Sequence, residues 1–310
     1  MVTYTELQEV FLPAPTAVAV GFFDGVHLGH RRVLDTVIQL KAEGLSSAVF
    51  SYTVEEHIPQ AKVGFSYLRT ATLKQKYLEA LGVDFLMMPP FDSFCSLSAE
   101  EFARDILHGR MQARVVCCGS DLRYGKHAAA DAKQLQADGK RFGFEVRIVE
   151  PVCVGRQKVS SSRIREYIRQ GAVDKANELL DRPFAFDFEV VRGNQLGRTI
   201  DSPTINQVLP ERFIIPKFGV YASVAVVHGK LYPAVTNVGV KPTIGSDKIL
   251  AETHIIGFED DLYGQHVEVR LLKFTRPEQK FPGVPQLKAQ IAKDTQNSID
   301  TLKKIGGICV

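Results

Sequence analysis

Val18-Ala-Val-Gly-Phe-Phe-Asp-Gly-Val-His-Leu-Gly-His30 is the stretch that decides the fold of the N-terminal half. It opens with a short apolar run typical of a buried strand, continues through a turn at Asp24-Gly25, and predicts a helix that begins near His27 or Leu28. A strand that turns directly into a helix is the start of a βαβ unit. The segment therefore predicts that this strand belongs to a parallel sheet.

The pattern around this segment repeats the same alternation of strand and helix up to about residue 182. Short apolar runs predict strands at 18–21, 47–51, 84–88, 114–118 and 145–150, and three- and four-residue spacing predicts helices at 31–44, 72–81, 98–107, 131–142, 161–170 and 173–180. Such a series implies an α/β domain with helices on both faces of a parallel sheet. Its ligands are expected at the carboxyl ends of the strands, where the strand order reverses.

The C-terminal half has a different pattern, with apolar and polar residues alternating in period two. Strands are predicted at 186–191, 219–227, 230–238, 252–257 and 266–274, separated by turn clusters. Short strands at this spacing predict a closed antiparallel barrel. A terminal helix is expected from Val284 to Lys293, with an extension to Lys304 left open. We therefore place the domains at 1–183 and 184–310.

The composition is that of an ordinary globular protein, with 310 residues, 45% of them apolar, and a net charge of +3. It excludes disordered, collagenous and disulfide-scaffold proteins. The small net charge predicts no nucleic-acid partner, and apolar runs shorter than the ~18 residues of a membrane helix predict no membrane partner. The N-terminus carries neither a basic patch nor an apolar run, which indicates no secretory signal. We expect a cytoplasmic protein that is a monomer or a weak homo-oligomer.

The cysteines favour the same compartment. Their number is odd and none forms a Cys-x-x-Cys pair, so buried free thiols in a reducing cytosol are favoured over disulfides or a metal site. Cys117 and Cys118 are adjacent in a predicted strand, so they are expected to face opposite sides of the sheet. The five cysteines are Cys95, Cys117, Cys118, Cys153 and Cys309.

The first candidate site lies in the opening segment. His27 and His30 are three residues apart, which places both side chains on one face of the first helical turn, and Gly29 lets a ligand approach the backbone. The free N–H groups and the positive dipole end of a helix bind anions. Two imidazoles there can donate hydrogen bonds to phosphate oxygens. Two structural histidines remain the alternative, and zinc is the weaker option because no third ligand is near in sequence.

The second candidate is Val159-Ser-Ser-Ser-Arg-Ile-Arg165, which opens a predicted helix. Hydroxyls at an N-cap satisfy helix donors, so capping is one interpretation. Three serines followed by Arg163 and Arg165 exceed what a cap requires and suit a triphosphate. The phosphate interpretation gains from the histidine segment, since the two together provide donors for one nucleotide.

The third candidate lies in the C-terminal half. Thr204 and Asn206 are two residues apart, so their side chains share a face of extended backbone, and their neutral oxygens can complete a Mg²⁺ shell of phosphates and water. Gly193 and Gly197 allow backbone N–H groups to turn toward phosphate. Pro-Thr-x-Asn is also a common turn, and that alternative stays open.

These motifs together resemble a known family. Gly-x-Phe-Asp-Gly-x-His-x-Gly-His, the downstream Ser-Ser-Ser-x-Ile-Arg and Gly119-Ser-Asp-Leu-Arg-Tyr-Gly125 are similar to prokaryotic bifunctional riboflavin kinase/FMN adenylyltransferases. The resemblance implies a Rossmann-like nucleotidyltransferase domain in which the FMN phosphate attacks the α-phosphate of ATP. It implies that His27 and His30 stabilise the transferring group. ATP would contact Gly21, Phe22, Asp24, Gly25, Gly29, Ser160, Ser161, Ser162 and Arg165, and flavin would contact Gly119, Asp121, Arg123 and Tyr124.

The C-terminal half resembles the riboflavin kinase barrel of the same family. Phe218-Gly-Val-Tyr-Ala222, Asn237-Val-Gly-Val-Lys-Pro-Thr243 and Asp261-Leu-Tyr-Gly264 carry the resemblance. It implies Mg²⁺ and ATP as cofactor and co-substrate, riboflavin, FMN and FAD as flavin substrates and products, and Glu252 as the general base; without the family, Glu252 would be a solvated strand-edge carboxylate. Thr204 and Asn206 would hold the metal, while ATP or flavin would contact Gly193, Gly197, Arg198, Pro203, Asn237 and Arg276.

The chain departs from the family pattern at three places. Ser51-Tyr-Thr-Val-Glu-Glu-His-Ile-Pro59 stands where the family has Phe-x-Pro-His-Pro, with His57 as a loose substitute for the family histidine. His127-Ala-Ala-Ala-Asp131 replaces a basic stretch, and Asp201-Ser202 replaces a glycine and an apolar residue before Pro203. Three hypotheses follow: an enzyme with both activities, an adenylyltransferase with a degenerate kinase barrel, or a flavin-binding regulator without activity.

Overall fold

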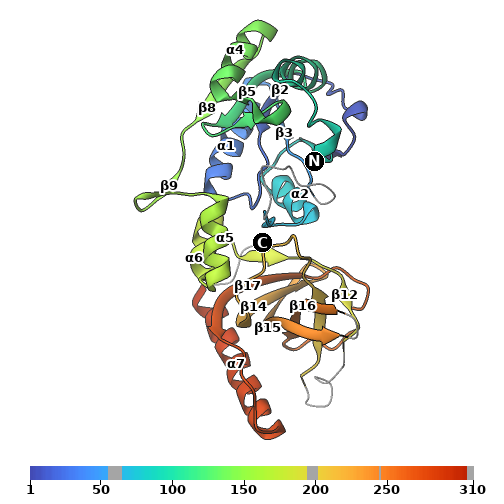
Figure 1. Ribbon diagram of the computed structural model, residues 1–310, viewed down its shortest axis with the longest axis vertical. Helices are drawn as coiled ribbons and strands as arrows, with labels where there is room; N and C mark the ends of the chain where they lie inside the picture. Colours follow the sequence, from blue (N-terminus) through green and yellow to red (C-terminus); the bar gives the residue numbers. More distant parts are fainter. Residues whose placement is uncertain (55–64, 194–201, 244–245, 306–310) are drawn as a thin grey trace. The chain divides into compact units, whose positions relative to one another are not determined.

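The computed structural model describes residues 1–54, 65–193, 202–243 and 246–305, with side chains omitted at 241–243, 246 and 247. The chain forms two compact units (Figure 1). The first comprises Met1–Phe65 and Ala71–Ser160, and the second comprises Ser66–Thr70 and Ser161–Val310. This division follows compactness, whereas the boundary at residue 183 follows the change in sequence pattern and stays a prediction.

The first unit is built on a parallel sheet, as predicted. Its strand order is β1-β4-β3-β2-β5-β8, and every neighbouring pair is parallel. The order reverses beside β2, because β3 and β4 follow on one side and β5 and β8 on the other. The strands are β1 (Val2–Tyr4), β2 (Thr16–Val20), β3 (Ser46–Phe50), β4 (Phe85–Met87), β5 (Ala113–Gly119) and β8 (Glu145–Val149).

Helices cover both faces of this sheet. One apolar cluster joins α1 and α2 to the sheet, and the other joins the π-helical segment η5 and α4. Cys117 belongs to the first cluster and Cys118 to the second, which confirms that they face opposite sides. The helices are α1 (Leu28–Gln39), η2 (Leu40–Glu43), α2 (Ala71–Ala80), α3 (Ala99–Glu101), η5 (Phe102–Arg110) and α4 (Ala132–Phe142).

Smaller elements complete the first unit. Cys95 is half-buried and Cys153 is exposed, so buried thiols were wrongly expected at these two positions, and Cys309 lies outside the described residues. Cys153 is exposed because it lies on a two-stranded hairpin, β9–β10, instead of in the main sheet. The remaining elements are η1 (Leu7–Glu9), η4 (Phe91–Ser93), β6 (Arg123–Tyr124), η6 (Lys126–Ala128), β7 (Ala130–Asp131), β9 (Cys153–Val154) and β10 (Gln157–Lys158).

The second unit contains the expected antiparallel barrel. Its strand order is β11-β17-β14-β15-β16-β13-β12, and the first and last strands come from one continuous segment, 184–191. The sheet closes there, because Glu189 bridges His266 and the Val190 N–H donates to Gln265 O. The strands are β11 (Phe184–Phe186), β12 (Val190–Val191), β13 (Thr204–Val208), β14 (Gly219–Val227), β15 (Lys230–Thr243), β16 (Ser246–Ile255) and β17 (Glu268–Arg276).

Barrel closure corrects the expected single strand at 186–191. The segment changes partners from β17 to β13, and Asp187 between the two short strands is buried and accepts a hydrogen bond from Thr70 at 2.5 Å. Burial raises the pKa of Asp187, and the hydrogen bond from Thr70 opposes this effect. One continuous pattern of apolar residues therefore covers two strands, because both of them contribute to the same core.

The second unit has three helices: α5 (Ser161–Gln170), α6 (Val173–Leu180) and α7 (Val284–Ile305). Of these, α6 and α7 pack on strands of the barrel, and α5 packs on α6. Asn177 on α6 donates to Leu271 O at 3.0 Å, which explains why α6 belongs to the second unit. Ser298 on α7 donates to Ala234 O at 2.6 Å, so α7 contacts β15 beyond Lys293, and the extension that the sequence left open is present. No helix of the described residues combines the length and the apolar character needed to cross a membrane.

Candidate active sites

The turn between β2 and α1 is held in a strained backbone conformation. Phe23 has φ of 51° and Val26 has φ of 46°, in the left-handed region that side chains with a Cβ rarely occupy. Both side chains are buried, so core packing offsets a strain of about 1–3 kcal/mol for each residue. Gly25, with φ of 84°, completes the turn. This backbone conformation lets the chain turn from the end of β2 into the start of α1 within a few residues.

His27 and His30 lie together at the start of α1, as predicted. Their rings are stacked, with centroids 3.6 Å apart, and Phe23 meets His30 edge-on. His27 is the N-cap, and its Nδ1 accepts the N–H of His30 at 3.2 Å. Because Nδ1 accepts, the proton of a neutral His27 lies on Nε2, which is then a donor. The N–H of His30 is therefore bonded to His27 and does not point to an anion, although the sequence predicted free N–H groups in the first turn. The Nε2–H of His27 is a donor that can take its place.

Gly29 keeps the space beside His27 open. A Cβ at Gly29 would lie 3.1 Å from Cε1 of His27 and 3.7 Å from Val159 O. The close approach of Val159 places the segment before Ser160 next to the histidines within the first unit. Gly21 is similar, since a Cβ there would lie 3.2 Å from the ring of Phe23.

A buried lysine that sequence reasoning missed ties this turn to the next strand. Lys74 on α2 is 4% exposed, and its Nζ donates to Phe22 O at 3.1 Å, Ser51 Oγ at 3.1 Å and Tyr52 O at 3.0 Å. Its ammonium also lies 4.5 Å from the ring centroid of Phe22. The segments after β2 and β3 are thus held together by one cation. A lysine within a helical pattern gives no signal of burial.

Aromatic rings line the same edge of the sheet. Phe22 stacks on Tyr52 with centroids 4.7 Å apart, Phe65 lies 5.6 Å from Phe22, and Phe91 lies 5.4 Å from Tyr52. Burial, followed by the negative charge of Asp24, raises the pKa of Tyr52. Asp24 is itself buried. The carboxyl ends of three strands therefore present flat apolar surface next to charged groups.

The segment after β5 contributes an ion pair. Asp121 follows Gly119, the last residue of β5, and pairs with Lys158 at 2.8 Å. Partial burial raises the pKa of Asp121, but the hydrogen bond from Lys158, the charge of Lys158 and then that of His27 lower it below its usual value. Arg123 is exposed, whereas Tyr124 is buried and donates to Asp138 at 2.6 Å. Tyr124 thus uses its hydroxyl inside the core.

The serine segment spans the division between the units. Ser160 ends the first unit, Ser161 is the first residue of α5 in the second unit, and Ser162 is exposed. Arg165 is buried, and its Nε donates to Ser66 O at 2.6 Å within the second unit. The guanidinium of Arg165 therefore has a structural contact beside any role toward phosphate.

The barrel brings a row of polar side chains together across three strands. In the register of β13, β16 and β15, Asn206 is opposite Glu252, and Glu252 is opposite Asn237. The next pair on the same side is Thr204 opposite His254. Sequence reasoning singled out four of these five residues, but their alignment depends on strand register.

Gly193 lies against the side chain of Asn206. A Cβ at Gly193 would be 2.6 Å from Nδ2 of Asn206, which is 6% exposed. Close packing alone explains a glycine here, and the phosphate-binding turn predicted from the sequence stays a prediction. Gly197, Arg198 and Asp201, together with His57, lie outside the described residues.

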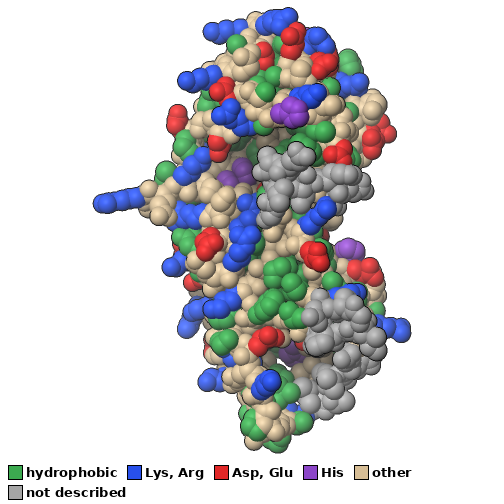
Figure 2. Space-filling model, in the orientation of Figure 1, with side chains coloured by type: hydrophobic (Ala, Val, Ile, Leu, Met, Phe, Trp, Pro, Cys, Tyr) green, Lys and Arg blue, Asp and Glu red, His purple; other side chains and the backbone are tan. Residues whose placement is uncertain are grey.

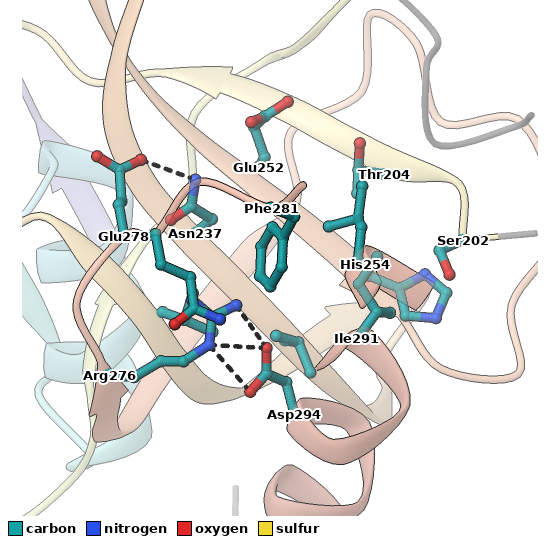
Figure 3. Close-up of a pocket in the computed structure, with 14 residues that line it drawn as sticks. Ser202, Thr204, Asn237, Glu252, His254, Arg276, Glu278, Phe281, Ile291 and Asp294 are labelled. Carbon is teal, nitrogen blue, oxygen red and sulfur yellow. Dashed lines mark hydrogen bonds and ion pairs between the residues drawn. The ribbon is translucent and has the colours of Figure 1, made fainter. Parts of the chain in front are cut away.

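Two cavities flank the row, and Figure 3 shows the residues that line the first of them. One, of about 350 Å³, is lined by Glu252, Asn237 and Arg276; the other, of about 450 Å³, is lined by Pro203, Asn206 and Tyr263. Thr204 lines both cavities. A reactant in each cavity would therefore meet the other at Thr204 and its neighbours.

The first cavity is bordered by α7 and the segment that follows β17. Arg276 pairs with the buried Asp294 of α7, with Nη2 at 2.7 Å and Nε at 3.1 Å from Oδ2 (Figure 3). Asn237 donates to Glu278 at 3.1 Å, and Phe281 points between these two pairs (Figure 3). Arg276 is thus held in a fixed orientation at the edge of the cavity.

The oxygen atoms of the row fit a magnesium ion whose other ligands are phosphate oxygens and water. Thr204 and Asn206 offer neutral oxygens, which Mg²⁺ accepts alongside phosphates and water. Across the described residues, no group of three His, Cys, Asp or Glu side chains is placed to hold a metal. The packing of Gly193 against Asn206 holds the carboxamide in place without a charged ligand.

The chain is similar to known proteins over both of its halves. Residues 12–163 match the family described as FAD synthetase, and residues 180–302 match riboflavin kinase. A bifunctional riboflavin kinase/FMN adenylyltransferase from Listeria monocytogenes is 35% identical over 90% of each chain, and one from Bacillus subtilis is 34% identical over 92% of each. A crystal structure from Streptococcus pneumoniae, described as a macrolide-efflux protein, is 30% identical with a TM-score of 0.83, covering 96% of this chain and 99% of that chain.

Fold and sites define a two-unit enzyme of nucleotide and phosphate chemistry. The chain belongs to the family of bifunctional riboflavin kinase/FMN adenylyltransferases. The resemblance noted in the sequence is confirmed, and with it the pairing of a nucleotidyltransferase domain with a kinase barrel. Flavins and ATP are substrates that fit this family.

Proposed function

We propose that the chain phosphorylates riboflavin in its second unit and transfers AMP from ATP to the resulting FMN in its first unit. The observation that carries this proposal is the polar row of Asn206, Glu252 and Asn237 between two cavities, separate from the stacked His27 and His30 of the other unit. The two groups of side chains differ in chemistry and lie in different units, which supports two separate reactions.

In the second unit, Glu252 is the general base. It takes the proton of the riboflavin 5′-hydroxyl as that oxygen attacks the γ-phosphorus of ATP, and ADP leaves. The 350 Å³ cavity would hold the flavin, with Asn237 and Arg276 at its ring, and the 450 Å³ cavity would hold the nucleotide. Thr204 and Asn206 would hold Mg²⁺, which neutralises phosphate charge when bound.

In the first unit, a phosphate oxygen of FMN attacks the α-phosphorus of ATP, and pyrophosphate leaves with the electrons of the broken P–O bond. His27 and His30 donate hydrogen bonds to the oxygens on which charge increases. Phe22 and Tyr52 offer a stacking surface for the flavin ring. Ser160 would hold phosphate oxygens of ATP, as the family resemblance implies.

The surroundings of the reaction are part of the proposal. We propose a cytoplasmic enzyme, a monomer or weak homo-oligomer, which acts on small molecules and has no nucleic-acid partner. Cys117 and Cys118 are buried, unpaired thiols, in keeping with a reducing compartment. Lys and Arg side chains lie among Asp and Glu on the face of the first unit seen in Figure 2, without a single-sign patch there.

Product chromatography with two variants tests this function. Wild-type protein given riboflavin, ATP and Mg²⁺ is expected to form FMN and then FAD. His27→Ala should stop at FMN, whereas Thr204→Ala should make FAD from added FMN but no FMN from riboflavin. If both variants lose both reactions equally while remaining folded, the assignment of one reaction to each unit is wrong.

A further inference from the structure

His254 is a histidine of the kinase barrel to which the resemblance assigns no role. It follows Glu252 by two residues on β16, so the two side chains share a face of the strand. It lines the 350 Å³ cavity, and its partner across the β13–β16 register is Thr204. In Figure 3 its ring lies beside Ser202, at the start of the segment that leads into β13.

The hydrogen bond of His254 defines its tautomer. Its Nδ1 lies 2.9 Å from Pro203 O. A backbone carbonyl can only accept a hydrogen bond, so Nδ1 carries the proton and donates it. The neutral ring then has its lone pair on Nε2. Because Nδ1 is protonated in the neutral and in the charged ring, this contact does not depend on the protonation of His254.

Pro203 directly precedes Thr204, so the hydrogen bond from His254 acts on the backbone next to the proposed metal ligand. β13 begins at Thr204, and Thr204↔His254 is the first register pair of that strand. Pro203 therefore lies one residue outside the β13–β16 ladder, and proline has no N–H with which to extend it. Pro203 O belongs to the peptide unit whose nitrogen is that of Thr204. Holding this oxygen fixes the peptide plane that precedes Thr204, and with it the direction of the Thr204 side chain.

We propose that His254 is a positioning residue of the kinase site, which aims the Thr204 hydroxyl at Mg²⁺ through its Nδ1–H bond to Pro203 O. The inference rests on the proposed role of Thr204 as a metal ligand. It assigns the function to one ring nitrogen, since Nδ1 makes the contact and Nε2 does not. Residues that orient metal ligands change metal affinity by about 10- to 100-fold when they are replaced.

Three substitutions separate the two nitrogens. In His254→Asn the amide Nδ2 can take the place of Nδ1–H, whereas in His254→Gln the amide reaches the position of Nε2, and His254→Ala removes both. The measurement is calorimetric binding of Mg²⁺ with a non-hydrolysable ATP analogue to the full chain, which does not depend on turnover. We expect His254→Asn to stay near the wild-type affinity for Mg²⁺, and the Gln and Ala variants to lose about 10- to 100-fold.

Thr204→Ala, measured in parallel, distinguishes the two ways to fail. If Thr204→Ala leaves Mg²⁺ binding unchanged, the proposed metal role of Thr204 is wrong. If it weakens Mg²⁺ binding but His254→Ala and His254→Gln do not, the positioning role of His254 alone is overturned. Retention by Gln together with loss in Asn would also overturn it, because Nε2 would then be the acting atom. Formation of FAD from added FMN, unchanged in all variants, shows that the first unit is intact, and a wild-type urea unfolding transition shows that the barrel of each variant is folded.

Discussion

Replacing Gly193 with alanine tests whether close packing holds Asn206 in the kinase site. The new Cβ would lie 2.6 Å from Nδ2, 2.8 Å from Cγ and 3.0 Å from Oδ1 of Asn206, whereas ordinary contacts begin at 3.4 Å. The carboxamide must therefore move by 3.4 − 2.6 = 0.8 Å. Asn206 is 6% exposed and lines the 450 Å³ cavity, so a displaced carboxamide would move within the site itself. A displacement of this size at a reacting centre costs about 100-fold in rate, or about 2.7 kcal/mol of transition-state stabilisation.

The assay compares the two reactions of one preparation. We expect kcat/KM for riboflavin phosphorylation to fall by about 100-fold in Gly193→Ala, with FAD formation from FMN unchanged. Gly29→Ala is the matched variant in the other unit, where the Cβ would lie 3.1 Å from His27 Cε1, so the shift is 3.4 − 3.1 = 0.3 Å. It should slow FAD formation by a smaller factor and spare the kinase. Gly193→Ala with wild-type kinase activity, or with equal loss of both activities, would refute the packing argument.

Three further substitutions test the buried lysine of the first unit, the proposed general base and the ion pair of Arg276. Lys74→Met removes the ammonium that donates to Phe22 O, Ser51 Oγ and Tyr52 O, so we expect about 2 kcal/mol less stability in urea unfolding and a selective loss of FAD formation, with Lys74→Arg as the control. Glu252→Gln should lower FMN formation by about 10²- to 10⁴-fold at unchanged ATP binding, and unchanged phosphorylation would reject Glu252 as the base. Asp294→Asn weakens the anchor of Arg276, and we expect about 2 kcal/mol less stability together with a higher KM for riboflavin; an unaltered KM would separate Arg276 from flavin binding.

The N-terminal sheet was predictable because its inner strands contain short apolar runs, whereas the edge strand β8, Glu-Val-Arg-Ile-Val, alternates. Parallel strands are buried on both faces, and their sequences show this directly. β1 was missed, because three residues with an exposed end carry no periodic signal. The helix expected at 98–107 was found as a short α-helical turn that continues as a π-helix to Arg110, a variation that apolar spacing does not encode.

The barrel was predictable as a class but less so in its details. β14 was predicted with its observed ends, since alternating residues flanked by turns define it. β13 was not predicted as a strand, because Thr204 to Val208 follows a proline and reads as a turn. The segment 186–191 was predicted as one strand, because the change of hydrogen-bonding partner that closes the barrel leaves the apolar pattern intact.

The two candidate sites differ in what their geometry depends on. His27 and His30 are brought together by one helical turn, so the spacing of the residues was enough to predict their contact. Asn206, Glu252 and Asn237 come from three strands and meet only when the register is correct. A slip of one residue would turn Glu252 to the other face of the sheet. The kinase site therefore depends on barrel closure, and Gly193→Ala and His254→Gln are expected to affect it through contacts between different segments, that of Gly193 with the Asn206 side chain and that of His254 with Pro203 O.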